Sequence, residues 1–349
     1  MNHPYLIIAC VFLSIGFVCS GLCGQQKNNG EDQLWCVYEP AEGKANGKQI
    51  VLIAGDDEYR SEEALPMLGK ILARRHGFKC TVLFPINSEN LIQPSFQTNI
   101  PGMHHLDQAD LAIMGLRFRN LPDHQMKHFA DYLGSGKPII GLRTSTHAFN
   151  YPKDSQSKYK HFGYNDSTWE GGFGQQVLGD TWISHHGHHK RESTRGVVVE
   201  KNASHPVLKG VKDIWGPTDV YGIKHLPKTA TVLLDGAVLE GMSPSDKPLN
   251  GPKNNPMMPL AWLREYTNDS GKTNLIFCTT MGSSTDFESE DLRRLIVNAA
   301  HWCVGMEDQI TDNANVTLVD PYSPTPYGFG NFKKGTRPSD YNLKNKTTQ

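Results

Sequence analysis

Short runs of consecutive apolar residues alternate along the chain with segments of helical periodicity, and few folds accommodate that order. Each run has the length and composition of a strand that is buried on both faces. Helices are predicted from Ser61 to Gly77 and from Leu121 to Gly134 or Gly136. The sequence therefore predicts an α/β fold with a doubly wound, mostly parallel sheet and helices on both faces. The four apolar runs lie at residues 49–54, 80–84, 110–114 and 137–142.

The same order continues to a closing helix, so we predict one α/β domain over residues 49–306. Further strands are expected near residues 197–199, 231–234, 259–263 and 274–279. Residues 24–48 are polar and are predicted to be a linker. Residues 307–349 are rich in proline, glycine and polar side chains, and we expect a tail that wraps around the domain or is partly disordered.

The N-terminal segment indicates export. Residues 5–18 are almost entirely apolar, which suits the core of a signal peptide and is too short for a membrane-spanning helix. We predict a signal peptide over residues 1–23 and a secreted or periplasmic protein. Leu22 directly before Cys23 disfavours a lipid anchor. No later run is long and apolar enough to form an integral membrane span.

Charge and cysteine usage narrow the function classes. With 35 basic and 36 acidic residues the formal net charge is −1 and no basic block stands out, which argues against a nucleic-acid partner. A small neutral polar ligand such as a carbohydrate is compatible with this composition. The four cysteines beyond the signal peptide are expected to be buried free thiols, with a disulfide bridge as the alternative. The protein could also form a homo-oligomer, since the sequence does not define the oligomeric state. These cysteines are Cys36, Cys80, Cys278 and Cys303.

Polar residues follow the predicted strands at the edge where open parallel sheets bind ligands. After the strand at 137–142, Arg143 and His147 are candidate catalytic groups that contact substrate or transfer a proton. Ser145 lies at the same turn, but the glycines and the cysteine of known nucleophile elbows are absent. The candidate substrate-binding residues are Asp56, Asp57, Tyr59, Arg117, Thr144, Tyr221 and Ser283.

A histidine-rich segment provides the second set of candidates. His185, His186 and His188 could bind a divalent metal such as zinc, because imidazole is a common ligand and alternate residues of an extended segment share a face. Metal-free acid–base catalysis or hydrogen bonding to a sugar is the alternative, with His186 the catalytic candidate. Asp219 is the carboxylate expected to orient an imidazole.

Several short motifs follow one another in a recognisable order. They are the first strand with its acidic loop, the strand at 137–142 that ends in Gly141-Leu142, the glycine-rich approach to His185, residues 205–210, Asp219-Val220-Tyr221, Leu260-Ala261-Trp262 and residues 276–282. This order resembles the ThuA-like (trehalose-utilisation) family, whose fold is similar to class I glutamine amidotransferases and flavodoxin-like domains. The chain departs from the family pattern where a histidine commonly follows the Gly-Leu pair, because Arg143 stands there, and where Gly282-Ser283 replaces Gly-His.

The resemblance implies a role in carbohydrate metabolism. We expect an enzyme, a hydrolase, lyase or isomerase, that acts on a glycoside or keto-sugar by histidine acid–base catalysis, with or without a metal. Glutamine amidotransferase activity is not expected, since the cysteine is absent. The two displaced histidines leave a catalytically silent carbohydrate-binding or scaffold domain as the rival hypothesis.

Overall fold

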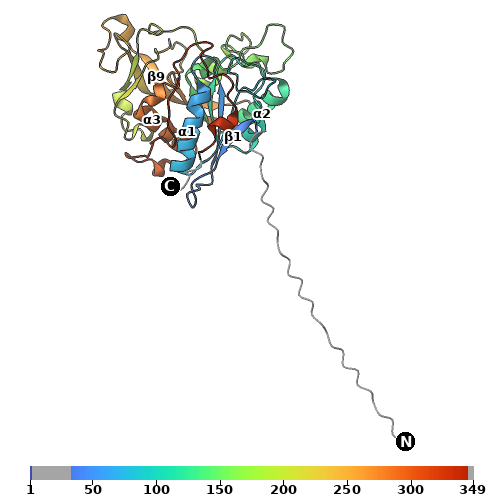
Figure 1. Ribbon diagram of the computed structural model, residues 1–349. Helices are drawn as coiled ribbons and strands as arrows, with labels where there is room; N and C mark the ends of the chain where they lie inside the picture. Colours follow the sequence, from blue (N-terminus) through green and yellow to red (C-terminus); the bar gives the residue numbers. More distant parts are fainter. Residues whose placement is uncertain (2–32, 345–349) are drawn as a thin grey trace. The chain divides into compact units, whose positions relative to one another are not determined.

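The computed structural model describes residue 1 and residues 33–344. Residues 33–344 form one sheet with helices packed against it (Figure 1). The predicted signal peptide and the first part of the predicted linker lie outside the described residues. Within them, ten strands follow the order β1-β3-β2-β4-β5-β10-β9-β8-β6-β7. The strands are β1 (Trp35–Tyr38), β2 (Gln49–Gly55), β3 (Lys79–Leu83), β4 (Leu111–Leu116), β5 (Ile139–Leu142), β6 (Thr194–Val198), β7 (Ile214–Gly216), β8 (Thr231–Val238), β9 (Met258–Thr267) and β10 (Thr273–Thr279).

The predicted helices are present and cover both faces of the sheet. They are α1 (Ser61–His76), α2 (Asp123–Gly134) and α3 (Glu290–Cys303). Successive side chains of β2 point to opposite faces, so Ile50 and Leu52 pack in one core with α1 and α3. Val51 and Ile53 pack in the other core with α2. Gly77 ends α1 in the left-handed conformation, at φ 77°, as the sequence predicted.

The prediction of a mostly parallel sheet was wrong, because the sheet is mixed. The pairings β3–β2, β2–β4, β4–β5 and β5–β10 are parallel. The other five pairings, which involve β1, β6, β7, β8 and β9, are antiparallel. A parallel pair needs a long crossover, whereas β9 and β10 are joined by the short turn 268–272. Apolar runs alone do not reveal which connection follows.

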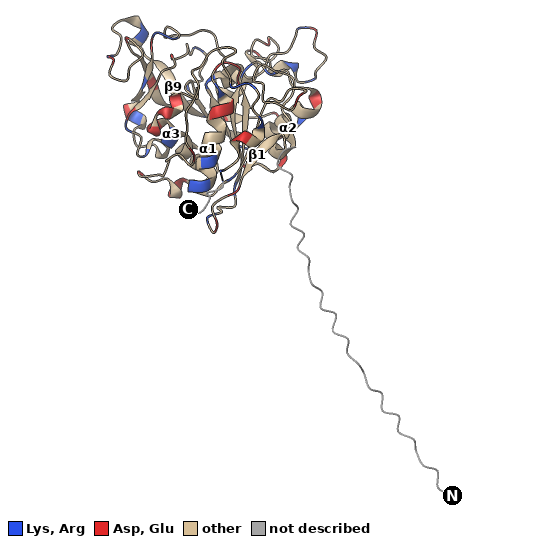
Figure 2. Ribbon diagram, in the orientation of Figure 1, with Lys and Arg blue, Asp and Glu red and all other residues tan. Residues whose placement is uncertain are grey.

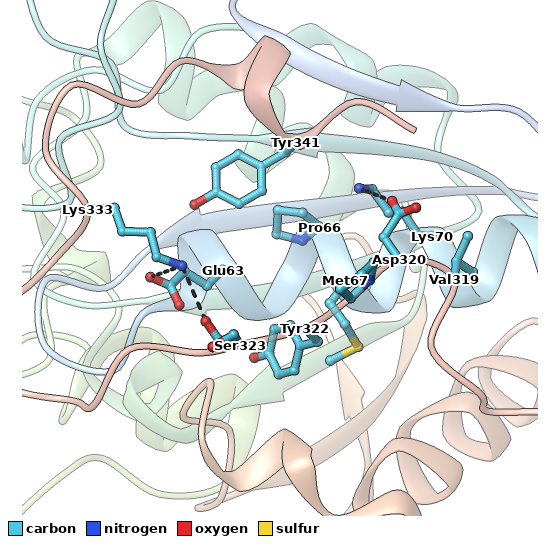
Figure 3. Close-up of a pocket in the computed structure, with 11 residues that line it drawn as sticks. Glu63, Pro66, Met67, Lys70, Val319, Asp320, Tyr322, Ser323, Lys333 and Tyr341 are labelled. Atoms are coloured by element: carbon cyan, nitrogen blue, oxygen red, sulfur yellow. Dashed lines mark hydrogen bonds and ion pairs between the residues drawn. The ribbon is translucent and has the colours of Figure 1, made fainter. Parts of the chain in front are cut away.

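The described parts of the two segments that flank the domain pack against it. The range 24–48, expected to be a linker, contains β1, whose four residues were too few to recognise as a strand. Residues 307–344 return across α1, where Lys70 pairs with Asp320 at 2.6 Å (Figure 3). A cavity of about 110 Å³ lies between α1 and this C-terminal segment.

The distribution of charged residues and the state of the cysteines agree with what the composition predicts. Basic and acidic residues are interspersed along the ribbon (Figure 2). None of the described helices has both the length and the apolar character required to cross a membrane. The expectation of buried free thiols is confirmed for Cys36, Cys80, Cys278 and Cys303.

Candidate functional site

The candidate site is a pocket at the carboxyl edge of the parallel strands. Strands β2, β4, β5 and β10 run in the same direction, so the loops that follow them meet at one edge. The pocket has a volume of about 310 Å³, at the lower end of the range of about 300–1,000 Å³ for small-molecule sites. Its lining combines aromatic rings with cationic, imidazole and carboxylate groups. The lining residues are Glu58, Tyr59, Arg117, Phe118, His147, Trp182, His185, His189, Lys190, Tyr221 and Phe329.

A buried carboxylate, Asp219, lies below the pocket and holds two imidazoles. Its Oδ2 is 2.6 Å from Nδ1 of His185, and its Oδ1 is 3.0 Å from Nδ1 of His189. Burial raises the pKa of Asp219, but the hydrogen bonds from the two histidines and the nearby charge of Arg143 outweigh it and hold this pKa well below its usual range. Asp219 is therefore ionised at neutral pH and can orient both rings.

Backbone pairing explains how the histidine segment reaches Asp219. His185 forms an isolated antiparallel bridge with Tyr221, and the amide of His186 donates to the carbonyl of Val220 at 2.9 Å. Gly187 passes so close that a Cβ there would lie 3.0 Å from Cβ of Asp219. The chain then turns and brings His189 to the second carboxylate oxygen.

His189 lies between two carboxylates. Its Nδ1 faces Asp219, and its Nε2 is 3.3 Å from Oε1 of Glu58. A neutral imidazole has one N–H to donate, so hydrogen bonds to both carboxylates at once would need a second proton, on the ring or on Glu58. Burial and the charge of Asp56 raise the pKa of Glu58, and the opposing charges of Arg117 and other cations offset this only in part. Glu58 is thus the carboxyl group of the pocket that most readily holds a proton.

Arg143 supports the site from below and does not line the pocket. It follows β5 in the left-handed conformation, at φ 40°, which is the strained turn where α/β enzymes place a nucleophile. Its guanidinium donates to the carbonyls of Thr280 and Asp219 at 2.7 and 3.0 Å. Its Cζ lies 4.0 and 4.4 Å from the ring centroids of Tyr59 and Tyr221. The predicted substrate contact is therefore corrected: Arg143 is 1 % exposed and fixes Asp219 and two tyrosines.

His147 does line the pocket, as a neutral ring among aromatic side chains. Burial lowers its pKa far below the usual value, and the charges of Arg117 and Arg143 lower it further. The rings of Phe118 and Trp182 lie 5.1 and 5.3 Å from it, centroid to centroid. A neutral imidazole in this setting can accept or donate a hydrogen bond to a ligand, and it holds no positive charge at neutral pH.

The predicted substrate-binding residues separate into two groups. Tyr59, Arg117 and Tyr221 line the pocket. Asp57 pairs with Arg117 at 2.8 Å and so fixes this cation at the pocket wall.

The remaining predicted contacts are buried inside the loops. Asp56 accepts the hydroxyl of Thr144 at 2.6 Å and the amide of Glu58 at 2.8 Å. Ser283 is buried, and its amide donates to Asp286 at 3.0 Å. Ser145, the candidate at the turn after β5, is fully buried and donates to the carbonyl of Met114 at 2.8 Å. These side chains shape the loops and do not face a ligand.

The predicted metal-ligand set needs correction. His186 bonds the carbonyl of Lys253 through Nε2 at 2.7 Å, and His188 is exposed, so neither joins the imidazole cluster. The segment turns after residue 187, and the alternation expected of an extended strand therefore fails. Among the described residues, the group that could hold a metal ion is His185, His189 and Asp219, with candidate ligand atoms within 4.8 Å of one another.

Several pocket residues were not among the predicted site residues. His189 could have been found from its four-residue spacing from His185, which suits a turn better than a strand. Glu58 is one of three consecutive acidic residues, and their sequence alone does not indicate which side chain turns into the pocket. Phe329 comes from the C-terminal segment, for which no sequence signal indicated a position. The others are Phe118, Trp182 and Lys190.

The fold and the site together define an α/β protein whose strand-to-turn elbow carries arginine and whose pocket holds an imidazole–carboxylate cluster. The family model for ThuA, described as trehalose utilisation, matches residues 59–303. Because that match covers more than half of the chain, the protein belongs to the ThuA family. No curated protein matches the sequence significantly.

Solved structures with similarity to this chain include two ThuA-like proteins. The one from Bacteroides uniformis is 16 % identical, with 79 % of this chain and 98 % of that chain covered and a TM-score of 0.45. The one from Parabacteroides merdae is 14 % identical, with 85 % and 99 % covered and a TM-score of 0.46. PurLQS from Thermotoga maritima is 12 % identical, with 73 % and 98 % covered and a TM-score of 0.38. These identities are too low to transfer an activity.

Proposed function

We propose that the protein is a carbohydrate-active enzyme that acts on a glycoside or keto-sugar by proton transfer at His185, His189 and Glu58. The observation that carries this proposal is the bonding of Asp219, whose two oxygens each face the Nδ1 of a pocket histidine. Membership of a family described by trehalose utilisation supports a sugar as the substrate class. The aromatic and polar lining of the pocket suits such a ligand.

His185 is the proposed general base. When its ring is neutral, Nδ1–H donates to Asp219, and the lone pair of Nε2 is free to accept a proton. With a keto-sugar, that proton leaves the carbon beside the carbonyl, and the C–H electron pair forms the enolate. The ionised Asp219 then stabilises the imidazolium that results.

Glu58 is the proposed general acid. Burial raises the pKa of Glu58, and its protonated form can donate to the enolate oxygen, or to the glycosidic oxygen that leaves when the enolate electron pair re-forms the carbonyl and the C–O bond at the adjacent carbon breaks. His189 links Glu58 to Asp219 and so couples the acid to the carboxylate that orients the base.

Two other mechanisms have less support. Glycosidases commonly need two carboxyl groups beside the scissile bond, and Glu58 is the carboxylate among the lining residues, since the Asp219 side chain is fully buried. Nucleophilic catalysis at the elbow is disfavoured because Arg143 is permanently protonated.

The rival function is sugar binding without catalysis. It is favoured by the elbow itself, where Arg143 and Ser145 are both bonded to main-chain carbonyls and neither is free to react.

The test is turnover of trehalose and other glucosides, each with and without oxidation of one ring hydroxyl to a ketone. Nuclear magnetic resonance in D2O would follow both bond cleavage and exchange of the carbon-bound proton. We expect His185→Gln to abolish turnover while binding persists. His186→Gln is the matched control, because it makes the same change in the same segment away from the cluster. Full activity of His185→Gln would refute the proposal, and binding without turnover in the wild type would establish the rival function.

We also propose that the mature protein is exported, on the basis of the apolar run at residues 5–18. The mass of the protein recovered outside the cytoplasm would test this, since cleavage near residue 23 is expected. Recovery of uncleaved chain from the cytoplasm alone would contradict export.

A further inference from the structure

The C-terminal segment lies beyond the part of the chain that the family model matches, yet it is firmly bonded to α1. The carboxylate of Glu63 accepts the amide and the hydroxyl of Thr325 at 2.8 and 2.7 Å. Lys333 pairs with the same carboxylate at 3.5 Å and also donates to the carbonyl of Ser323, as Figure 3 shows. These bonds fix the path of the segment toward the candidate site.

The segment then enters the wall of the pocket. The ring of Tyr327 stacks on that of Tyr59 at a centroid distance of 5.4 Å, and its hydroxyl donates to the carbonyl of Pro217 at 3.0 Å. The amide of Gly328 donates to the carbonyl of Glu58 at 2.8 Å. The residue that follows, Phe329, is therefore held in place by both of its preceding neighbours.

Phe329 presents an aromatic ring to solvent at the pocket. Its exposed fraction is 59 %, and it is the aromatic member of the few large apolar side chains that are exposed among the described residues. The guanidinium carbon of Arg117 lies 4.8 Å from its ring centroid. An apolar ring beside a hydrogen-bond donor suits a sugar, because the C–H groups of one sugar face are apolar and its hydroxyls can accept from the guanidinium.

We propose that Phe329 is a specificity-determining platform for a second sugar ring, next to the ring that reacts at His185. This inference rests on the proposed function and deepens it, since it assigns the substrate class as glycosides with at least two sugar rings. The pocket has a volume of about 310 Å³, which is small for a ligand site. A second sugar ring would therefore lie at the edge of the pocket, against Phe329.

The test is calorimetric binding of trehalose, maltose, cellobiose and glucose, with their keto derivatives, to the full chain. We expect Phe329→Ala to weaken disaccharide binding by about tenfold, the value of one aromatic contact. Glucose binding should not change, and Phe329→Trp should restore disaccharide binding. Val197→Ala, which shortens an exposed apolar side chain on β6, is the control. Thermal unfolding would verify that each variant is folded.

The outcomes separate the inference from the proposed function. Equal binding of disaccharides by wild type and Phe329→Ala, equal losses for glucose and disaccharides, or binding of glucose alone would each overturn the platform and leave the proposed function in place. Failure of the wild type to bind any of these sugars would overturn both.

Discussion

Replacing Asp219 by Asn should remove the charge that orients two imidazoles while keeping the size of the side chain. In the wild type the carboxylate faces His185, His189 and Arg143, at 2.6, 3.0 and 3.3 Å. The amide of Asn retains one acceptor oxygen, and its NH2 group opposes a histidine N–H. At least one ring should lose its orientation.

The expected magnitude follows from the burial of these groups. Removing one partner of a buried ion pair costs about 3–5 kcal/mol, and Asp219→Asn also leaves Arg143 without its counter-ion. Because one acceptor survives, we expect the free energy of unfolding to fall by about 3 kcal/mol. Turnover per folded molecule should fall by about 10²–10⁴-fold, the range for loss of an oriented acid–base histidine.

The assay combines chemical denaturation with turnover of the best substrate. Asp180→Asn is the matched control, because Asp180 is also fully buried and bonds Nδ1 of His225 at 3.0 Å, away from the pocket. Both variants should lose stability, and only Asp219→Asn should lose turnover. Wild-type turnover in Asp219→Asn, or an equal loss in Asp180→Asn, would refute the assignment of Asp219 as the orienting group.

The pH dependence of stability gives an independent check. The pKa of Asp219 is lower in the folded protein than in the unfolded chain. Its contribution is therefore fully present above the unfolded pKa of about 3.9 and is lost as the pH falls toward the folded pKa. Asp219→Asn should lack this part of the acid-induced loss. If the free energy of unfolding fell equally with decreasing pH in both proteins, the partners of Asp219 would not stabilise its ionised form.

Three further predictions concern other groups. Glu58→Gln should lower turnover by about 10²-fold. We expect the wild type to lose activity as the pH rises through the raised pKa of Glu58, and the variant to lack this loss; an unchanged pH profile of kcat/KM would contradict the prediction. Burial raises the pKa of Glu62 to about 8, since Arg60 at 3.9 Å does not offset it, so its contribution to stability is full below about pH 4 and is lost as pH rises to about 8. As the pH rises over that range, the free energy of unfolding of Glu62→Gln should come to exceed that of the wild type by a few kcal/mol. The same difference between the two proteins at pH 5 and at pH 9 would refute this. The double variant His186→Ala, His188→Ala should keep wild-type turnover and metal content by elemental mass spectrometry, because neither ring joins the cluster; loss of either would contradict the geometry.

Local patterns were sufficient to predict the central part of the fold. The strands β2, β4 and β5 are buried along nearly their whole length, so their apolar runs were unambiguous. The direction of the later strands was not predictable in the same way, because it depends on whether a helix or a turn joins them. The short strand β1 gained its place from pairing with β3, a contact that its four residues do not encode.

The sequence predicted at which edge of the sheet the site lies, but not which side chains contact one another there. Tyr59, Arg117 and His147 follow strands and line the pocket, as a reading of strand ends implies. Arg143 follows a strand too, yet its side chain turns under the pocket because it has partners there. The position of Phe329 depends on the path of the C-terminal segment, which lies more than 170 residues after the elbow in the sequence. Side-chain hydrogen bonds to α1 fix that path.

The arginine at the elbow explains why the reactive groups of this pocket lie elsewhere. A nucleophile in the strained position after β5 would point its reactive atom into the pocket, whereas Arg143 extends below it and donates to carbonyls on two loops. Gly282 allows that approach, because a Cβ there would lie 2.9 Å from Cβ of Leu142. The buried cation adds to the hydrogen bonds from His185 and His189 and so helps to keep Asp219 ionised at this depth. Since Asp219 then fixes two imidazoles at the pocket wall, a residue that cannot act as a nucleophile supports acid–base chemistry from beneath the site.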